Sequence, residues 1–287
     1  MNSQNVVLPT FLICGAAKSG TTSLYHYLRG HANVYMSSEK ETRFFSSEEH
    51  FRRGVSWFQQ FFKEYEGEKA IGEADTGTMY YRGSAARVHE IVPGAKLIFV
   101  LRNPIEQVYS HYWFGAERGI YDCQVRSFSE FIRDNEDRWT KKILSTPKYY
   151  DQLVRFDPYF DKEHRLTLLF DDIQNNIQHV MNKIYRFIEV EPCLVSDARK
   201  HNVTSYPSNP KFYRRLYRLW KPIRQQIPKS VIQRTVGVRS TLKNMMYSEQ
   251  QGKPSMDLAD RTYLREMYRE PNAHLAEYLD RDLSHWT

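Results

Sequence analysis

The 287-residue chain is 41% hydrophobic and 26% charged, a balance that predicts a soluble folded domain with a substantial core and excludes an intrinsically disordered chain. No stretch approaches the roughly 20 apolar residues of a membrane-spanning helix, and residues 1–10 lack the pattern of a signal peptide. The three cysteines are widely spaced, which excludes a disulfide framework and a cysteine-based metal site and favours a reducing, cytoplasmic setting.

The net charge of +7 comes from one segment rather than from the whole chain. Between Lys211 and Lys243 there are ten Lys or Arg residues and no Asp or Glu, and the remainder of the chain is slightly acidic. A local excess of this kind does not indicate a nucleic-acid-binding fold, so we expect no nucleic-acid partner.

The first predicted element is a short buried strand at residues 11–14, followed by a tight turn from Gly15 to Gly20 and a helix from Thr21. A strand, a loop of small residues and a helix N-terminus together form an anion site, because backbone N–H groups and the helix dipole face the loop. Lys18 adds a full positive charge, so a phosphate or a similar group is the expected guest. The candidate binding residues are Lys18, Ser19, Gly20, Thr21, Thr22 and Ser23.

The spacing of this loop differs from that of a Walker A motif, in which the lysine follows the second glycine. Here Lys18 comes two residues before Gly20, and Thr21 stands where the Walker lysine would be. The sequence therefore indicates a phosphate loop of another kind.

The rest of the chain alternates strands and helices. Strands are expected at residues 33–36, 70–75, 95–101 and 165–170, and helices at 54–62, 82–92, 104–118, 128–139, 149–160 and 177–188, with a last helix from a cap at Asp257 to Leu279. This alternation predicts an α/β fold with a parallel, doubly wound sheet. Because ligands of such sheets bind beyond the carboxyl ends of the strands, we expect Lys18, Glu73 and Arg102 to converge.

Two motifs together resemble the donor-binding motifs of sulfotransferases that use 3′-phosphoadenosine 5′-phosphosulfate (PAPS). Residues 15–22 (GAAKSGTT) resemble the loop for the 5′-phosphosulfate, and residues 101–112 (LRNPIEQVYSHY) resemble the motif for the 3′-phosphate. The resemblance implies that Arg102 and Ser110 bind the 3′-phosphate, which suits a guanidinium fork and a serine about two helical turns further on. It also implies a three-layer, P-loop-like fold with a central parallel sheet flanked by helices.

Residues 40–45 (KETRFF) resemble a short motif of heparan-sulfate-type sulfotransferases and their bacterial relatives, in which the glutamate is the general base. The resemblance, which extends over nearly the whole chain, implies that Glu41 takes the acceptor's proton while Lys18 stabilises the leaving bisphosphate, without a metal. Glu73 is the reserve candidate for the base, and His111 is a third one. The acceptor is expected to be a carbohydrate or another small metabolite, and its reacting group can be a hydroxyl or an amine.

Two other interpretations stay open. Asp171 and Asp172 follow a strand as a Walker B aspartate does, which would suit a nucleotide kinase or NTPase, although the loop spacing argues against it and a helix-capping role is favoured. The basic patch at 211–243 could instead make the chain a non-enzymatic polyanion-binding module. For an enzyme we expect one sulfotransferase domain over residues 1–287. Its basic helical segment, at about 209–245, would be an acceptor-side lid, a solvated helix or a weak contact with a membrane surface.

Overall fold

The computed structural model describes residues 6–118, 120, 123, 126–195, 206–207, 212, 215, 247–248 and 254–286. Most of the basic segment expected at 209–245 therefore lies outside the described residues. By their internal contacts the residues form two compact units, one built from 1–107, 146–202 and 270–287 and the other from 108–145 and 203–269. The sequence-based expectation of a single domain stays a prediction.

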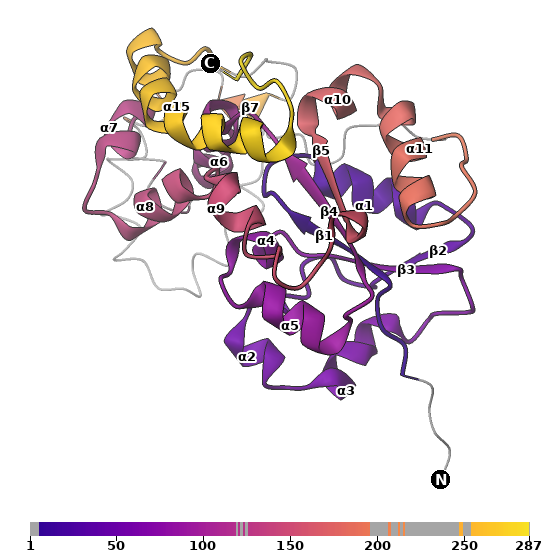
Figure 1. Ribbon diagram of the computed structural model, residues 1–287. Helices are drawn as coiled ribbons and strands as arrows, with labels where there is room; N and C mark the ends of the chain where they lie inside the picture. The colour runs from indigo at the N-terminus through magenta and orange to yellow at the C-terminus, as the bar shows by residue number, and fades with distance from the viewer. Residues whose placement is uncertain are drawn as a thin grey trace. The chain divides into compact units, whose positions relative to one another are not determined.

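The first unit contains a five-stranded parallel sheet with the strand order β2-β3-β1-β4-β5 (Figure 1). The strands are β1 (Phe11–Gly15), β2 (Val34–Met36), β3 (Ala70–Ala74), β4 (Lys96–Leu101) and β5 (Arg165–Leu169). Leu12 of the central strand β1 lies opposite both Glu73 and Leu97. The loop that follows β1 is therefore at the middle of the carboxyl edge of the sheet, where ligands of α/β proteins bind.

Short helices connect these strands. They are α1 (Thr21–Arg29), α2 (Glu48–Phe51), α3 (Val55–Phe58), α4 (Gly77–Tyr80), α5 (Ser84–Ile91), α9 (Tyr149–Leu153), α10 (Phe170–Asn175) and α11 (Ile177–Phe187), with 3-10 turns η1 (Gln59–Phe62) and η2 (Lys162–His164). The helix expected at 54–62 is thus an α-helix only as far as Phe58. The helix expected at 149–160 ends at Leu153, because the ring of Pro158 would clash with the carbonyl four residues earlier.

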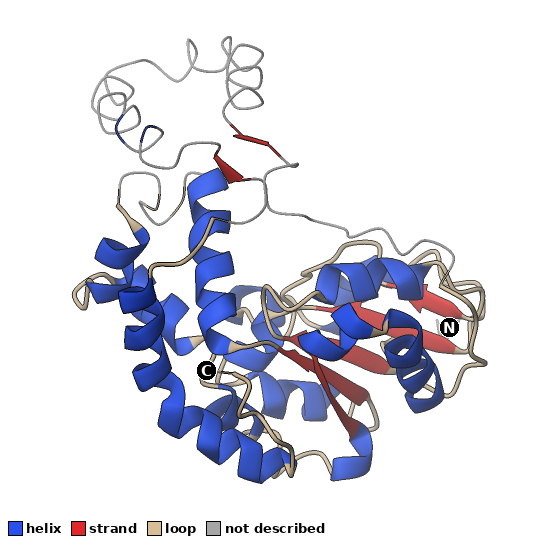
Figure 2. Ribbon diagram, turned by 90° about the horizontal axis from the view of Figure 1, so that it is seen from above, coloured by secondary structure: helices blue, strands red, loops and turns tan. Residues whose placement is uncertain are grey.

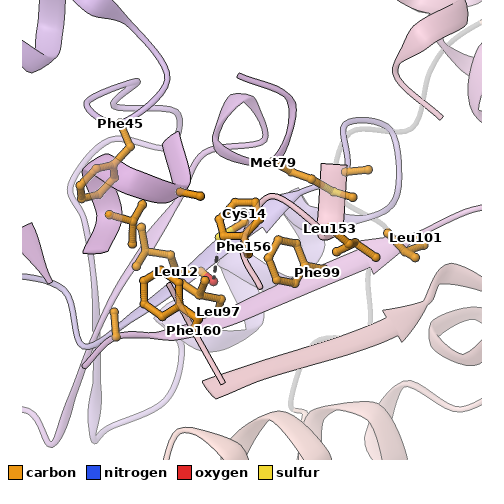
Figure 3. Packing of buried hydrophobic residues seen from close by; sticks show 14 of the residues in the cluster. Leu12, Cys14, Phe45, Met79, Leu97, Phe99, Leu101, Leu153, Phe156 and Phe160 are labelled. Carbon is orange, nitrogen blue, oxygen red and sulfur yellow. Dashed lines mark hydrogen bonds between the residues drawn. The ribbon is translucent and has the colours of Figure 1, made fainter. Parts of the chain in front are cut away.

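Helices cover both faces of the sheet (Figure 2). On one face, residues of β1 and β4 pack against α1 and α11, with Leu24, Leu28, Val180 and Ile184 buried. On the other face lie α5, α9 and the aromatic segment from Phe44 to Phe62. Figure 3 shows this second core, in which Leu12, Leu97 and Phe99 of the strands meet Leu153 and Phe156. The three-layer P-loop-like α/β architecture expected from the sequence is confirmed.

The second unit is largely helical in its described part. It contains most of α6 (Pro104–Arg118), α7 (Phe128–Arg133), α8 (Arg138–Ser145) and the first half of α15 (Leu258–Leu279). A short antiparallel pair, β6 (Tyr206–Pro207) with β7 (Tyr247–Ser248), also belongs to it. Asp257 caps α15 as expected, since its carboxylate accepts from the N–H of Ala259 (2.8 Å).

The single helix expected at 128–139 is wrong, because the chain forms two helices there. Asp134 accepts a hydrogen bond from the N–H of Asp137 (3.1 Å), and Asp137 accepts one from the N–H of Thr140 (2.8 Å). Aspartate side chains compete in this way for backbone donors, so the first helix ends and Asp137 starts the next one. None of the helices that the structure describes is long and apolar enough to cross a membrane.

Candidate functional site

The loop between β1 and α1 is held at its backbone by several neighbours. The N–H of Ala16 donates to a carbonyl of β4 (2.8 Å), and the side-chain amide of Gln107 donates to the carbonyl of Ala17 (2.7 Å). The guanidinium of Arg102 donates to the carbonyl of Lys18 (2.8 Å). Two of the sequence-predicted site residues, Lys18 and Arg102, are therefore neighbours at the carboxyl edge of the sheet.

Two left-handed residues shape this loop, Lys18 with a φ of 65° and Gly20 with a φ of 85°. At Gly20 a side chain would not fit, because a Cβ there would lie 2.9 Å from the ring of Phe170. The same ring lies under the guanidinium of Arg102, at 4.6 Å from ring centre to the central carbon. Phe170, which sequence reasoning did not single out, thus joins the loop to Arg102.

The N-terminus of α1 has the features of an anion site. No side chain caps its first turn, and that turn holds no acidic residue. The N–H groups of Thr21, Thr22 and Ser23 have no acceptor within their own helix. The Ser19 hydroxyl is fully buried beside the phenol of Tyr149, and it makes no hydrogen bond of ordinary geometry with the described part of the chain. A phosphate group bound here would satisfy these donors.

Arg102 is also fixed through its backbone. The hydroxyl of Tyr149 donates to the carbonyl of Arg102 (2.9 Å), and burial raises the pKa of this phenol, so it stays a neutral donor. Ser110, the expected partner of Arg102 at the 3′-phosphate, is buried on α6 within the second unit. Its pairing with Arg102 stays a prediction, as does the alternative role of His111 on the same helix.

Glu41 is tied to the carboxyl end of β3. Its N–H donates to the carbonyl of Ala74 (2.9 Å), and its carboxylate accepts from the N–H and the hydroxyl of Thr76 (3.1 and 3.0 Å). Burial by itself raises the pKa of Glu41, but the paired Lys40 ammonium and hydrogen bonds from Asp75 and Thr76 outweigh it and lower the pKa. Glu41 is therefore an ionised, well-oriented carboxylate that can accept a proton.

Two more carboxyl groups lie near Glu41, that of Glu73 in β3 and that of Asp75, the first residue after this strand. Glu73 is fully buried and accepts a hydrogen bond from the Thr42 hydroxyl (2.6 Å), while its second oxygen has no partner among the described residues. Asp75 is buried and accepts from the Ser46 hydroxyl (2.5 Å) and from a backbone N–H (2.9 Å). Burial and the charge of Asp75 raise the pKa of Glu73 to about 8. Burial and the charge of Glu41 raise the pKa of Asp75 to about 7.

Glu73 differs from its sequence-based expectation. It lies inside β3 rather than beyond its end, and its side chain points to Thr42 on the covered face of the sheet. Its convergence with Lys18 and Arg102 stays a prediction. Asp75, two residues further along, is the carboxylate that directly follows the end of β3.

A small cavity of about 20 Å³ lies beside the loop, with room for about one water molecule. Its lining consists of Ala16, Ala17, Thr76, Met79, Tyr80, Gln107, Thr146 and Gln152. Thr76, which binds the Glu41 carboxylate, thus faces the same hollow as the loop. Sequence reasoning missed Thr76 and Gln107, because a threonine and a glutamine carry no pattern that distinguishes them before the fold is known.

The aspartates that a nucleotide kinase would need are engaged elsewhere in the fold. Asp172 forms a bidentate pair with Arg281 (both distances 2.8 Å), and Asp171 accepts a hydrogen bond from the indole of Trp286 (2.9 Å). Among the described residues, no group of three or more His, Cys, Asp and Glu side chains could hold a metal ion. The two aspartates anchor the C-terminal segment.

The family model and the relatives that match this chain are all sulfotransferases. The family model described as "Sulfotransferase domain" matches residues 8–215. The chain is 36% identical over 136 residues to the membrane-associated sulfotransferase kil1 of Dictyostelium discoideum, a match that covers 45% of this chain and 28% of that protein. It is 25% identical over 286 residues to the human bifunctional heparan sulfate N-deacetylase/N-sulfotransferase 3, which covers 95% of this chain and 30% of that protein. The chain thus spans less than a third of the length of these relatives.

A solved structure has the same fold. The sulfotransferase from Alicyclobacillus acidocaldarius superposes with a TM-score of 0.69 at 22% sequence identity, and the match covers 98% of this chain and 99% of that one.

Proposed function

Because the chain belongs to the sulfotransferase family, we propose that it moves a sulfuryl group from PAPS to a hydroxyl or amine of an acceptor. The observation that carries this proposal is the hydrogen bond of 2.8 Å from the Arg102 guanidinium to the Lys18 carbonyl. It supports one continuous anion-binding surface, in which the loop holds the 5′ end of the donor and Arg102 holds the 3′-phosphate. The motif at residues 101–112 adds Ser110 as a further proposed ligand of the 3′-phosphate.

Each residue then has a defined task. PAPS, when bound, supplies a sulfuryl group on a good leaving group. Lys18 and the N–H groups at the start of α1 stabilise the negative charge that develops on the leaving bisphosphate. Glu41, held by Thr76 and ionised near neutral pH, takes the proton from the attacking group of the acceptor. The hollow lined by Thr76 and the loop is where these two ends of the reaction would meet.

The donor is tested by isothermal titration calorimetry with adenosine 3′,5′-bisphosphate and, separately, with ATP and Mg²⁺. We expect the bisphosphate to bind more tightly. Lys18→Met should weaken it about 10- to 100-fold, the value of a charge-assisted hydrogen bond, whereas Lys63→Met, at an exposed site, should leave it unchanged. A preference for ATP with Mg²⁺ would favour a kinase, and salt-sensitive binding of heparin without bisphosphate binding would favour the polyanion module.

The base is tested by transfer of radiolabelled sulfate from PAPS to N-desulfated heparan sulfate, other glycans and a simple phenol. Glu41→Gln should lower turnover about 10²- to 10⁴-fold, as expected for loss of a general base, and should still bind the bisphosphate. Glu39→Gln, an exposed carboxylate two residues earlier, is the matched control. Turnover of Glu41→Gln close to that of the unaltered protein would remove Glu41 from this role.

The acceptor class is proposed from two sources. The first is the resemblance of residues 40–45 to heparan-sulfate-type enzymes, and the second is the similarity to a heparan sulfate N-deacetylase/N-sulfotransferase over 95% of this chain. Both favour a carbohydrate, with another small metabolite as the alternative. A cytoplasmic location stays a prediction, and one relative is itself named as membrane-associated.

A further inference from the structure

The segment from Glu41 to Ser46 is fastened to β3 at successive points. The N–H of Glu41 donates to the carbonyl of the last residue of β3, the hydroxyl of Thr42 donates to Glu73 and the hydroxyl of Ser46 donates to Asp75. This arrangement brings three carboxyl groups together, two of them buried. A single general base does not require two further buried carboxyl groups. Neighbouring carboxylates also repel one another strongly when all of them are ionised.

We propose that Asp75 is a positioning residue for the base: its carboxyl shares a proton with that of Glu41, and the pair rather than Glu41 alone receives the acceptor's proton. The inference rests on the proposed function. Glu41 is bound on both sides of Asp75: its N–H donates to the Ala74 carbonyl (2.9 Å), and its carboxylate accepts from the Thr76 N–H (3.1 Å). The two carboxyl groups are therefore neighbours, and each shifts the pKa of the other. Thr76 supplies two donors to Glu41, and Ser46 and the Gly77 N–H supply donors to Asp75, so both carboxyls are held in place.

The surroundings decide where the shared proton lies. The ammonium of Lys40 pairs with Glu41 and favours its ionised form. For Asp75 no ion pair is found with a cation of the described residues. It faces Glu41, the buried Glu73 of β3 and the buried thiol of Cys14 on β1. Burial and the charge of Glu41 raise the pKa of Asp75 to about 7. Below that pH the pair holds one proton on the Asp75 side, and above it the pair holds none.

The pair makes a better base than an isolated glutamate. In the reaction the acceptor's oxygen or nitrogen forms a bond to sulfur, and the bond from sulfur to the bridging phosphate oxygen breaks, with its electron pair staying on the bisphosphate. The acceptor's proton passes to Glu41, which then donates it toward the Asp75 carboxylate, and the pair releases it to solvent. A base that gives up its proton at about pH 7 matches the working pH more closely than one near 4.5, the ordinary value for glutamate.

Transfer from labelled PAPS to the acceptors named above should therefore increase as the pH rises through about 7. Asp75→Asn should move this rise to below about pH 5 and lower the plateau, because the lone Glu41 is a weaker base. Ser46→Ala removes a donor that favours ionised Asp75, so its rise should move to higher pH. A general loss of stability would not move the pH of this rise in opposite directions in the two variants. Ser38→Ala, at an exposed site, is the control and should leave the pH profile unchanged.

A second measurement needs no substrate. In protein labelled with ¹³C at the aspartate carboxyl carbon, the Asp75 signal is the one that disappears in Asp75→Asn. Its NMR titration should have a midpoint near 7 and should move toward 3.8 in Glu41→Gln. A midpoint near 3.8 in the unaltered protein, or a pH profile that Asp75→Asn leaves in place, would overturn the inference even if the bisphosphate binds and sulfate is transferred. Absence of bisphosphate binding would instead reject the proposed function. The role of the Glu41–Asp75 pair as proton acceptor would then be rejected as well.

Discussion

The buried Glu73 makes a prediction about stability that does not depend on the function. In the folded protein its carboxyl is neutral at pH 7, because burial and the charge of Asp75 raise its pKa from 4.5 to about 8. In the unfolded chain it is ionised at the same pH. Between these two pKa values Glu73 keeps its proton in the folded state and loses it in the unfolded state. Its contribution to stability is therefore fully present below about pH 4.5 and is lost as the pH rises toward 8.

The size of the effect follows from the two pKa values. Each pH unit in this range lowers the free energy of unfolding by about 1.4 kcal/mol for each extra proton held by the folded state. Between about pH 5 and pH 7.5 the contribution of Glu73 is therefore on the order of 3 kcal/mol. Glu73→Gln keeps the size of the side chain and an oxygen that can accept from the Thr42 hydroxyl, but it cannot ionise. The variant should lack this part of the pH dependence.

The assay is urea unfolding of both proteins at several pH values from about 5 to 8.5, with the slope against urea checked for equality. The stability of Glu73→Gln relative to the unaltered protein should increase with pH, and the exposed Glu90→Gln should show no such trend. A difference between the two proteins that stays constant over the range, or that decreases with pH, would refute a buried and neutral Glu73.

Three further outcomes are expected. Gly20→Ala should lower the free energy of unfolding by about 1 to 2 kcal/mol in urea, because a methyl group in this left-handed position meets the Phe170 ring. Arg102→Lys keeps the charge but loses the planar fork and should weaken bisphosphate binding about 10-fold in calorimetry; an unchanged affinity would contradict its phosphate role. Trp286→Phe leaves Asp171 without its indole donor and should cost about 1 kcal/mol in thermal or urea unfolding.

Most of the sheet could be predicted from the sequence because its strands are buried on both faces and therefore read as continuous apolar runs. Residues 97–101 are all buried, as the run of hydrophobic residues there indicates. The helix boundaries were less predictable. The break at Asp134 depends on a side chain that bonds its own backbone, and the early end of α9 depends on Pro158, five residues beyond it.

Some residues of the candidate site could likewise be predicted from the sequence, and others could not. Lys18 and Arg102 could be predicted to meet, because each follows a neighbouring parallel strand and carboxyl ends share one edge. The contribution of Asp75 could not, since its environment comes from Ser46 and Glu41, some 30 residues earlier in the chain. A contact between a loop and a strand end produces no periodic pattern in the sequence, so it cannot be predicted from local sequence.

The conformation around Glu41 shows why the base and the core cannot be treated separately. Glu41 and Arg43 are both left-handed, with φ values of 67° and 57°, and each such residue costs on the order of 1 kcal/mol for an ordinary side chain. Phe44 and Phe45 follow directly and are fully buried, and the ring of Phe44 stacks on that of Phe58 at 4.2 Å. Burial of two aromatic rings can offset strain of this size. The two phenylalanines therefore hold the turn that places the Glu41 carboxylate against Thr76. Core packing and the proposed chemistry thus both depend on residues 40–45.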